Sequence, residues 1–133
     1  MKISQYPNPE RVAALSASDD PTPVVMVNLL KFKAQADGPD AGISGAEAYA
    51  KYGAAMRGIV EGAGGRLLWS GRVTDMVIGE SDVDFDVVAL MEYPSRAAFT
   101  KIVSDARVQS IGVHRAAGLL GQWLIAATTT QTI

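Results

Sequence analysis

The fold is decided by one stretch near the C-terminus, which reads Phe85-Asp86-Val87-Val88-Ala89-Leu90-Met91-Glu92-Tyr93-Pro94-Ser95-Arg96-Ala97-Ala98-Phe99. Its first nine residues are mostly apolar, β-branched or aromatic, as expected of a strand that is buried on both faces. Pro94 cannot continue a strand ladder, and Ser95 is a good N-cap for the amphipathic helix that Ala98, Phe99, Ile102 and Val103 outline. The stretch therefore predicts a strand, a tight corner and a helix that folds back toward the region of His114, the only histidine of the chain.

The rest of the chain is predicted to contain three more strands and another long helix. A capping box, Ser44-Gly45-Ala46-Glu47, predicts a helix that ends at the glycines around Gly62, and shorter helices are expected after Asn8 and from Asp105. Residues 33–43 show no period and form the one long loop of the prediction. We expect strands over residues 24–32, 66–79 and 119–128, the second of them bending near Gly71.

This order of elements is strand, helix, strand, strand, helix, strand. It predicts an α+β, ferredoxin-like βαββαβ fold, in which a four-stranded antiparallel sheet carries helices on one face. In the strands at residues 24–30, 67–78 and 85–91, both alternate sets of side chains are largely apolar. A sheet with an apolar uncovered face exposes more apolar surface than a monomer usually tolerates, so we expect two copies to pack sheet on sheet as a homodimer.

Length and composition narrow the class of protein. The 133 residues fit a single domain, 1–133, in which residues 1–23 form an N-terminal extension with a short helix. The net charge is -2 and the 12 basic residues are scattered among 14 acidic ones, so we expect no nucleic-acid partner. The absence of cysteine excludes disulfides and thiolate metal sites. No apolar run approaches the roughly 20 residues of a membrane span, and a cytoplasmic protein without a membrane partner is expected.

Five separated motifs resemble the bacterial family called domain of unknown function 1330. The resemblance implies the dimeric α+β barrel superfamily, which this family shares with small antibiotic-biosynthesis-type monooxygenases, EthD-like proteins and muconolactone isomerase. It implies no established reaction, and residues 1–23 fall outside it. The motifs, in order, are Val25-Met26-Val27-Asn28-Leu29-Leu30-Lys31-Phe32, then Ser44-Gly45 through Ala48-Tyr49 to Tyr52, then Gly65-Arg66-Leu67-Leu68-Trp69-Ser70-Gly71, then Tyr93-Pro94-Ser95-Arg96-Ala97-Ala98-Phe99, and His114-Arg115.

Two polar residues are candidates for chemistry. Asn28 is an amide inside an apolar strand, where an unpaired amide costs about 1–3 kcal/mol, so it either bonds to backbone or water or faces a ligand. His114 is the only group that ordinarily titrates near neutrality, so it is a candidate proton donor or acceptor, or else a structural residue at a helix end. One histidine without cysteine or a metal-ligand spacing predicts no metal site.

The aromatic and basic candidates for ligand binding are Tyr49, Tyr52, Trp69, Arg72 and Arg115. An aromatic stripe at helical spacing belongs to a core more often than to a pocket, although tyrosine and tryptophan each bring a polar end. Arg72 is able to pair with an anionic ligand or with a nearby aspartate. Arg115 follows His114 directly, and adjacent residues on a helix point in different directions.

Two functional hypotheses remain from the sequence. The first is a cofactor-independent, monooxygenase-like or isomerase-like enzyme for a small organic substrate, with Asn28, Trp69 and Tyr49 positioning it and His114 moving a proton. The second is a non-catalytic dimeric domain that binds a small molecule or only pairs with itself. The catalytic hypothesis predicts that His114 and Asn28 face one open cavity.

Overall fold

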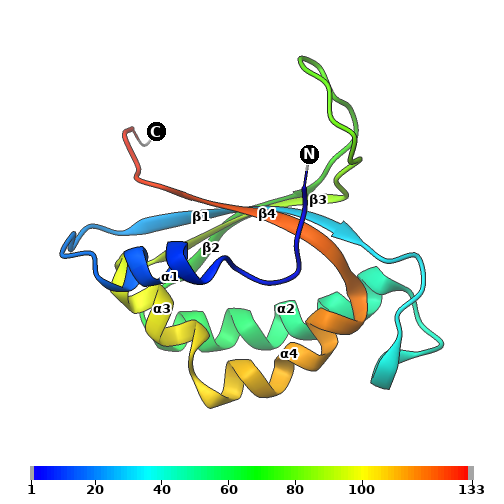
Figure 1. The fold of residues 1–133 in the computed structure, drawn as a ribbon, viewed down its shortest axis with the longest axis horizontal. Coiled ribbons are helices and arrows are strands. Elements are labelled where there is room, and N and C mark those ends of the chain that lie inside the picture. Colours follow the sequence, from blue (N-terminus) through cyan, green and yellow to red (C-terminus); the bar gives the residue numbers. More distant parts are fainter. Residues whose placement is uncertain (1, 132–133) are drawn as a thin grey trace.

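The computed structural model describes residues 2–131, which form one antiparallel sheet with helices beneath it (Figure 1). The sheet has four strands in the order β2-β3-β1-β4, and this order confirms the predicted ferredoxin-like fold. The elements, in chain order, are α1 (Pro9–Ser16), β1 (Val24–Phe32), the 3-10 turn η1 (Gly38–Asp40), α2 (Gly45–Gly62), β2 (Arg66–Arg72), β3 (Val87–Tyr93), α3 (Arg96–Val103), α4 (Ala106–Gly118) and β4 (Leu119–Ala127).

Local sequence explains where the helices begin. The side chain of Asn8 accepts hydrogen bonds from two amides at the start of α1, and Ser44 accepts one from Glu47 at the start of α2. Ser95 and Asp105 cap α3 and α4 in the same way. Each of these polar side chains satisfies an amide that has no partner within its helix, so the four predicted N-termini are confirmed.

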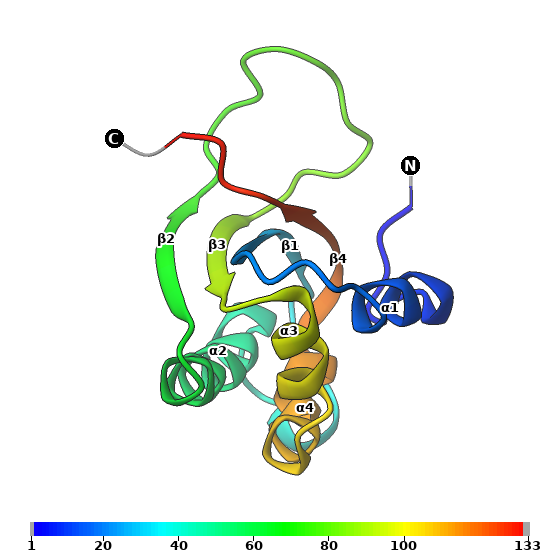
Figure 2. The ribbon, with the colours of Figure 1, turned by 90° about the vertical axis from the view of Figure 1, so that its left-hand side faces the viewer.

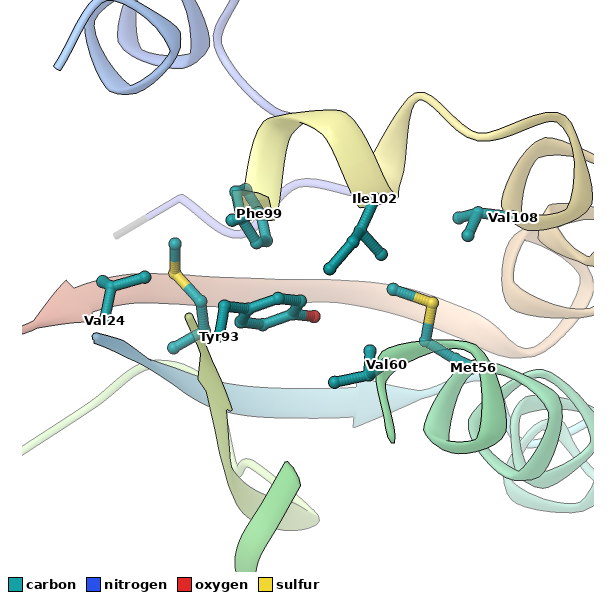
Figure 3. Close-up of a cluster of buried hydrophobic side chains, with 8 residues drawn as sticks. Val24, Met56, Val60, Tyr93, Phe99, Ile102 and Val108 are labelled. Carbon is teal, nitrogen blue, oxygen red and sulfur yellow. The ribbon is translucent and has the colours of Figure 1, made fainter. Parts of the chain in front are cut away.

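The core lies between the helix-side face of the sheet and the helices. Register places Val24, Met26 and Tyr93 on this face, and Figure 3 shows Val24 and Tyr93 with side chains from the helices. The rings of Tyr93 and Phe99 meet edge to face, with their centroids 4.9 Å apart. Burial of these side chains supplies most of the stabilisation of the fold. The cluster consists of Val24, Met26, Met56, Val60, Tyr93, Phe99, Ile102 and Val108.

Small residues set the distance between α2 and α4. A Cβ atom at Gly118 would lie 2.2 Å from the backbone oxygen of Gly45, so only glycine permits this close approach. The helix α1 packs against α3 near the β4 edge of the sheet, as Figure 2 shows. No helix within residues 2–131 combines the length and the apolar character that crossing a membrane requires.

The opposite face of the sheet carries no helix, and we call it the open face. Register assigns to it Val27, Leu29, Leu90, Trp69 and Ile125. Trp69 is 56% exposed and Ile125 is 50% exposed. Both faces of the sheet are therefore apolar, as the alternation predicted, but the chain covers only one of them with helices.

Two local predictions differ from the structure. The strand expected over residues 66–79 ends at Arg72, and residues 73–86 leave the sheet as a long excursion that we call the arm (Figure 1). The irregularity expected near Gly71 lies instead between Leu67 and Trp69. Gly71 has another role, because the indole ring of Trp69 lies over it and a Cβ atom there would clash with that ring.

The loop over residues 33–43 is held in place at several points. The Lys33 and Asp37 amides donate to the backbone oxygens of Gly118 and Ala117, and the Ala36 amide donates to Ile43. The carboxylate of Asp40 is buried beneath this loop. The loop is thus part of the packed structure, and the longest segment without a helix or strand within residues 2–131 is the arm.

Candidate functional site

A cavity of about 540 Å³ lies between the helix-side face of the sheet and α2. The sheet contributes residues of β1, β2 and β3, while α2 contributes the face of its first three turns and Arg57. No carboxylate, lysine or imidazole lines it. The lining residues are Asn28, Leu30, Phe32, Ala46, Tyr49, Ala50, Tyr52, Gly53, Ala54, Met56, Arg57, Leu67, Ser70, Val87, Ala89, Met91 and Tyr93.

Side-chain size explains why a cavity exists at this place. On α2, Ala46, Ala50, Gly53 and Ala54 face β2 with side chains too small to fill the gap to the sheet. Ala46, Ala50 and Ala54 are also exposed, as is Ser70 on β2, so the cavity opens to solvent between α2 and the β2 edge. The sequence therefore builds a pocket with an apolar floor and an open mouth.

Three tyrosines line this cavity, together with the polar residues Asn28, Ser70 and Arg57. Tyr49 stacks in a tilted geometry between Phe32 and Tyr52, at centroid distances of 5.2 Å and 5.4 Å. Within residues 2–131, none of the hydroxyls of Tyr49, Tyr52 and Tyr93 forms a hydrogen bond. None of the three is a fully buried atom, so each hydroxyl remains accessible to a hydrogen-bonding partner such as water or a ligand.

The protonation state of these tyrosines follows from their environment. Burial raises the pKa of Tyr49, Tyr52 and Tyr93 above the ordinary tyrosine value, because a phenolate is poorly solvated there. The neighbouring tyrosines raise the pKa of Tyr49 and Tyr93 further, whereas the charge of Arg115 lowers that of Tyr49 and Tyr52 by a smaller amount. The three side chains are neutral phenols at physiological pH and can donate hydrogen bonds to a bound molecule.

Asn28 is hydrogen-bonded within the sheet and also lines the cavity. Its Nδ2 atom donates to the backbone oxygens of Met26 at 3.2 Å and Ala89 at 3.3 Å, so the amide is paired within the sheet. The same side chain lines the cavity. With Nδ2 engaged by backbone, Oδ1 is the atom that can accept a hydrogen bond from a ligand.

The structure places the other predicted ligand-binding residues outside the cavity lining. Trp69 lies on the open face, and Arg72 ends β2 beyond the lining residues. The guanidinium of Arg115 lies 6.0 Å from the ring centroid of Tyr6, within cation–π range. The cavity thus brings together Asn28, Tyr49 and Tyr52 but not Trp69, Arg72 or Arg115.

His114 belongs to a different cluster. Its Nδ1 atom lies 2.6 Å from Oδ2 of Asp40, and Oδ1 of Asp40 accepts a hydrogen bond from Nζ of Lys51 at 2.8 Å. Lys51, and then His114, lower the pKa of Asp40, so its carboxylate is charged and Nδ1 of His114 must carry the proton of their hydrogen bond. The cluster ties η1 to α2 and α4, and none of its members lines the cavity.

The sequence did not identify three residues of these two sites, which are Asp40, Tyr93 and Arg57. Asp40 stands in an irregular loop, where no period assigns a direction to a side chain. Tyr93 was predicted only as the last residue of a strand, and its register with Val24 puts it on the helix-side face with Ala89 and Met91. Strand alternation was the signal that could have found it.

A second hollow of about 390 Å³ lies where the end of α2 meets α3 and the start of α4. Its one arginine, Arg107, is already paired, since its Nε and one terminal nitrogen each lie 3.1 Å from an oxygen of Asp105. Within residues 2–131, no group of three or more metal-binding side chains is placed to hold an ion.

Comparison with known proteins identifies relatives among solved structures. The crystal structure of RPA0582, a protein of unknown function from Rhodopseudomonas palustris, matches with a TM-score of 0.89 and 34% identity over 98% of this chain and 100% of that one. The crystal structure of methylated RPA0582 protein matches with a TM-score of 0.88 and 34% identity over 98% of each chain. No family model and no curated protein matches. At this identity over the full length of its relative, the chain belongs to the same family as RPA0582.

Proposed function

We propose that this protein binds a small, largely apolar organic molecule in the cavity between its sheet and α2. The observation that carries the proposal is that Tyr49, Tyr52 and Tyr93, three neutral tyrosines with accessible hydroxyls that have no partner within residues 2–131, line one cavity. A ligand with an acceptor oxygen would supply the hydrogen bonds that these groups lack. The volume of about 540 Å³ falls in the usual range for small-molecule sites.

The lining residues favour binding over catalysis in this cavity. Proton transfer needs a group that changes its protonation near the working pH, and burial keeps the three tyrosines protonated. His114 is directed to Asp40 and not to the cavity. Of the two functional hypotheses, the ligand-binding domain is therefore preferred to the monooxygenase-like or isomerase-like enzyme.

The proposal includes a homodimer and a family assignment. Two copies that pack through their open faces would bury the exposed side chains of Trp69 and Ile125. The five sequence motifs support membership in the domain of unknown function 1330 family and in the dimeric α+β barrel superfamily. The cytoplasm stays the predicted location.

A binding screen tests the ligand proposal. Aromatic ketones, phenols and carboxylates of one to three rings should include compounds that raise the melting temperature, and titration calorimetry should then give their affinities. Loss of one hydrogen bond costs about 1 kcal/mol, so Tyr49→Phe and Tyr52→Phe should each weaken binding roughly fivefold.

The matched control is Tyr6→Phe, which changes an exposed tyrosine outside the cavity. It should leave the affinity unchanged. A screen without any binder, or equal losses in all three variants, would count against the cavity as a ligand site.

A further inference from the structure

The arm, residues 73–86, is held by contacts at its base and is exposed to solvent at its tip. The Val73 amide donates to the backbone oxygen of Asp86 at 2.9 Å, and the Phe85 ring lies 5.1 Å from that of Trp123. At the tip, Val77 is 88% exposed and Ile78 is 89% exposed. A loop that is held at its base and exposes apolar residues at its tip is suited to bind another molecule through that tip.

The arm also differs in charge from the rest of the chain. It contains five of the 14 acidic residues of the protein and none of its 12 basic residues, although the protein as a whole is only weakly negative. Its partner should therefore combine an apolar depression with basic side chains around it. The acidic residues are Asp75, Glu80, Asp82, Asp84 and Asp86.

The mouth of the cavity has this combination. Exposed Ala50 and Ala54 form its apolar edge on α2, and the cavity behind them is mainly apolar. Arg57 on α2 lines the cavity at one end of the mouth, and Arg66 lies on the open face at the start of β2, the edge strand beside that end. Each forms an ion pair with a glutamate. Unlike Arg107, each uses only Nε to bond its glutamate within residues 2–131, so its terminal nitrogens can bond to acidic side chains of another chain.

The arm is long enough to reach this mouth in a second copy. Each leg has about seven residues and can span roughly 23 Å at the rise of an extended strand. Two sheets packed face to face lie about 10 Å apart, so a few residues per leg would suffice to cover the open face. The remaining length reaches past the sheet of the second copy toward its helix layer. Figure 1 shows that the arm extends on the side away from the chain's own helices, so it does not close its own cavity.

We infer that in the homodimer each arm crosses to the other copy and that its tip, Val77 and Ile78, closes the mouth of that copy's cavity between α2 and β2. In such a dimer the two-fold axis lies between the sheets and perpendicular to the strands, so the strands of the second copy run in the opposite direction. Each arm, which leaves the sheet after Arg72, then lies beside the β2 edge of the other copy at the end that carries Arg57 and Arg66. Each cavity is then completed by a segment of the partner chain. This inference rests on the dimer proposed above and not on the identity of any ligand.

Crosslinking tests the inference, and the absence of cysteine makes the experiment clean. A tagged chain with Val77→Cys is co-expressed with an untagged chain with Ala54→Cys, and the purified dimer is treated with a short bismaleimide reagent. The tagged and untagged chains should become linked at least about ten times more efficiently than when Ala54→Cys is replaced by Val113→Cys, because a docked pair has a millimolar effective concentration. Val113 is 49% exposed on α4 and serves as a matched acceptor away from the mouth. Unchanged melting temperatures confirm that the variants fold.

A second acceptor distinguishes the alternatives. Linkage of Val77→Cys to Ile125→Cys on the open face, in place of Ala54→Cys, would show that the arm lies between the sheets and would overturn the inference. Equal weak linkage to all acceptors would show a free arm and would also overturn it. Sedimentation of the same samples separates these results from failure of the dimer, and the ligand screen is independent of all of them.

Discussion

The two faces of the sheet are made by the same strands, and yet they end in different environments. On the helix side, Val24 and Met26 of β1 are almost completely buried. On the open face, Trp69 keeps 56% of its surface exposed and Ile125 keeps 50%. Alternation along a strand shows that a face is apolar, but it does not show what covers that face. The helix side is thus completed within the chain, whereas the chain's helices leave the open face uncovered, and the proposed homodimer would cover it.

The largest loss of stability is expected in the core beneath the sheet, compared with an exposed position of β4. Phe99→Ala removes a ring that packs edge to face on Tyr93 beneath the sheet, and it should lower the free energy of unfolding by about 3–5 kcal/mol. Leu120→Ala changes a residue that is 52% exposed and lies at the register shift of β4, outside the paired positions of the open face, and it should stay within about 0.5 kcal/mol of the wild type. Urea unfolding monitored by circular dichroism measures both. Equal losses would mean that the core is not concentrated on the helix side.

The next effect concerns association through the open face. Trp69→Glu would place an unpaired carboxylate in an apolar interface, so the dissociation constant of the dimer should rise at least about 100-fold, or roughly 2.7 kcal/mol. Val113→Glu adds the same charge on α4 and should leave the dimer intact. Analytical ultracentrifugation over a concentration series measures both constants. A Trp69→Glu variant that stays fully dimeric would exclude the open face as the interface.

Local signals predicted most of the fold. Asn8, Ser44, Ser95 and Asp105 each cap a helix because a short polar side chain must satisfy the free amides at a helix start. The arm escaped prediction because residues 73–78 have the β-branched and apolar composition of a strand. Strand formation also requires a partner, and the ladder of β3 ends at Val87.

The candidate site was only partly predictable. Tyr49 and Tyr52 were found because a helix period gives direction to side chains, and Asn28 because an amide is out of place in an apolar strand. His114 was found as a unique residue, but its partner depends on a loop whose path has no sequence signature. Its bond to Asp40 arises from tertiary packing of η1 against α4, which no local pattern encodes.

A smaller effect tests whether this cluster stabilises the helix side. Lys51 and His114 lower the pKa of Asp40, so its charged form stabilises the fold above the ordinary aspartate pKa of about 3.9, and this contribution is lost as the pH falls toward and through the lowered value. Asp40→Asn should therefore lower the melting temperature at pH 7 by a few degrees, and the difference from wild type should shrink in acid. Thermal melts between pH 7 and pH 2.5 give this difference profile. Asp37→Asn, which breaks only the more exposed pair with Lys33, should show a smaller difference at every pH.

The smallest effect separates a binding tyrosine from a structural one. Tyr93 is 5% exposed, and its hydroxyl has no hydrogen-bond partner in residues 2–131. Tyr93→Phe should therefore change the free energy of unfolding by less than about 0.5 kcal/mol, since a hydroxyl without a protein partner contributes no hydrogen bond to the fold. Ser95→Ala, which removes the hydrogen bond from the Ala98 amide, should cost about 1 kcal/mol in the same unfolding experiment. With a saturating ligand that accepts a hydrogen bond, the wild type should become more stable than Tyr93→Phe, because only its hydroxyl then gains a partner. A loss of about 1 kcal/mol without ligand would instead indicate a bond within the protein, and the hydroxyl would then not be available to a bound molecule.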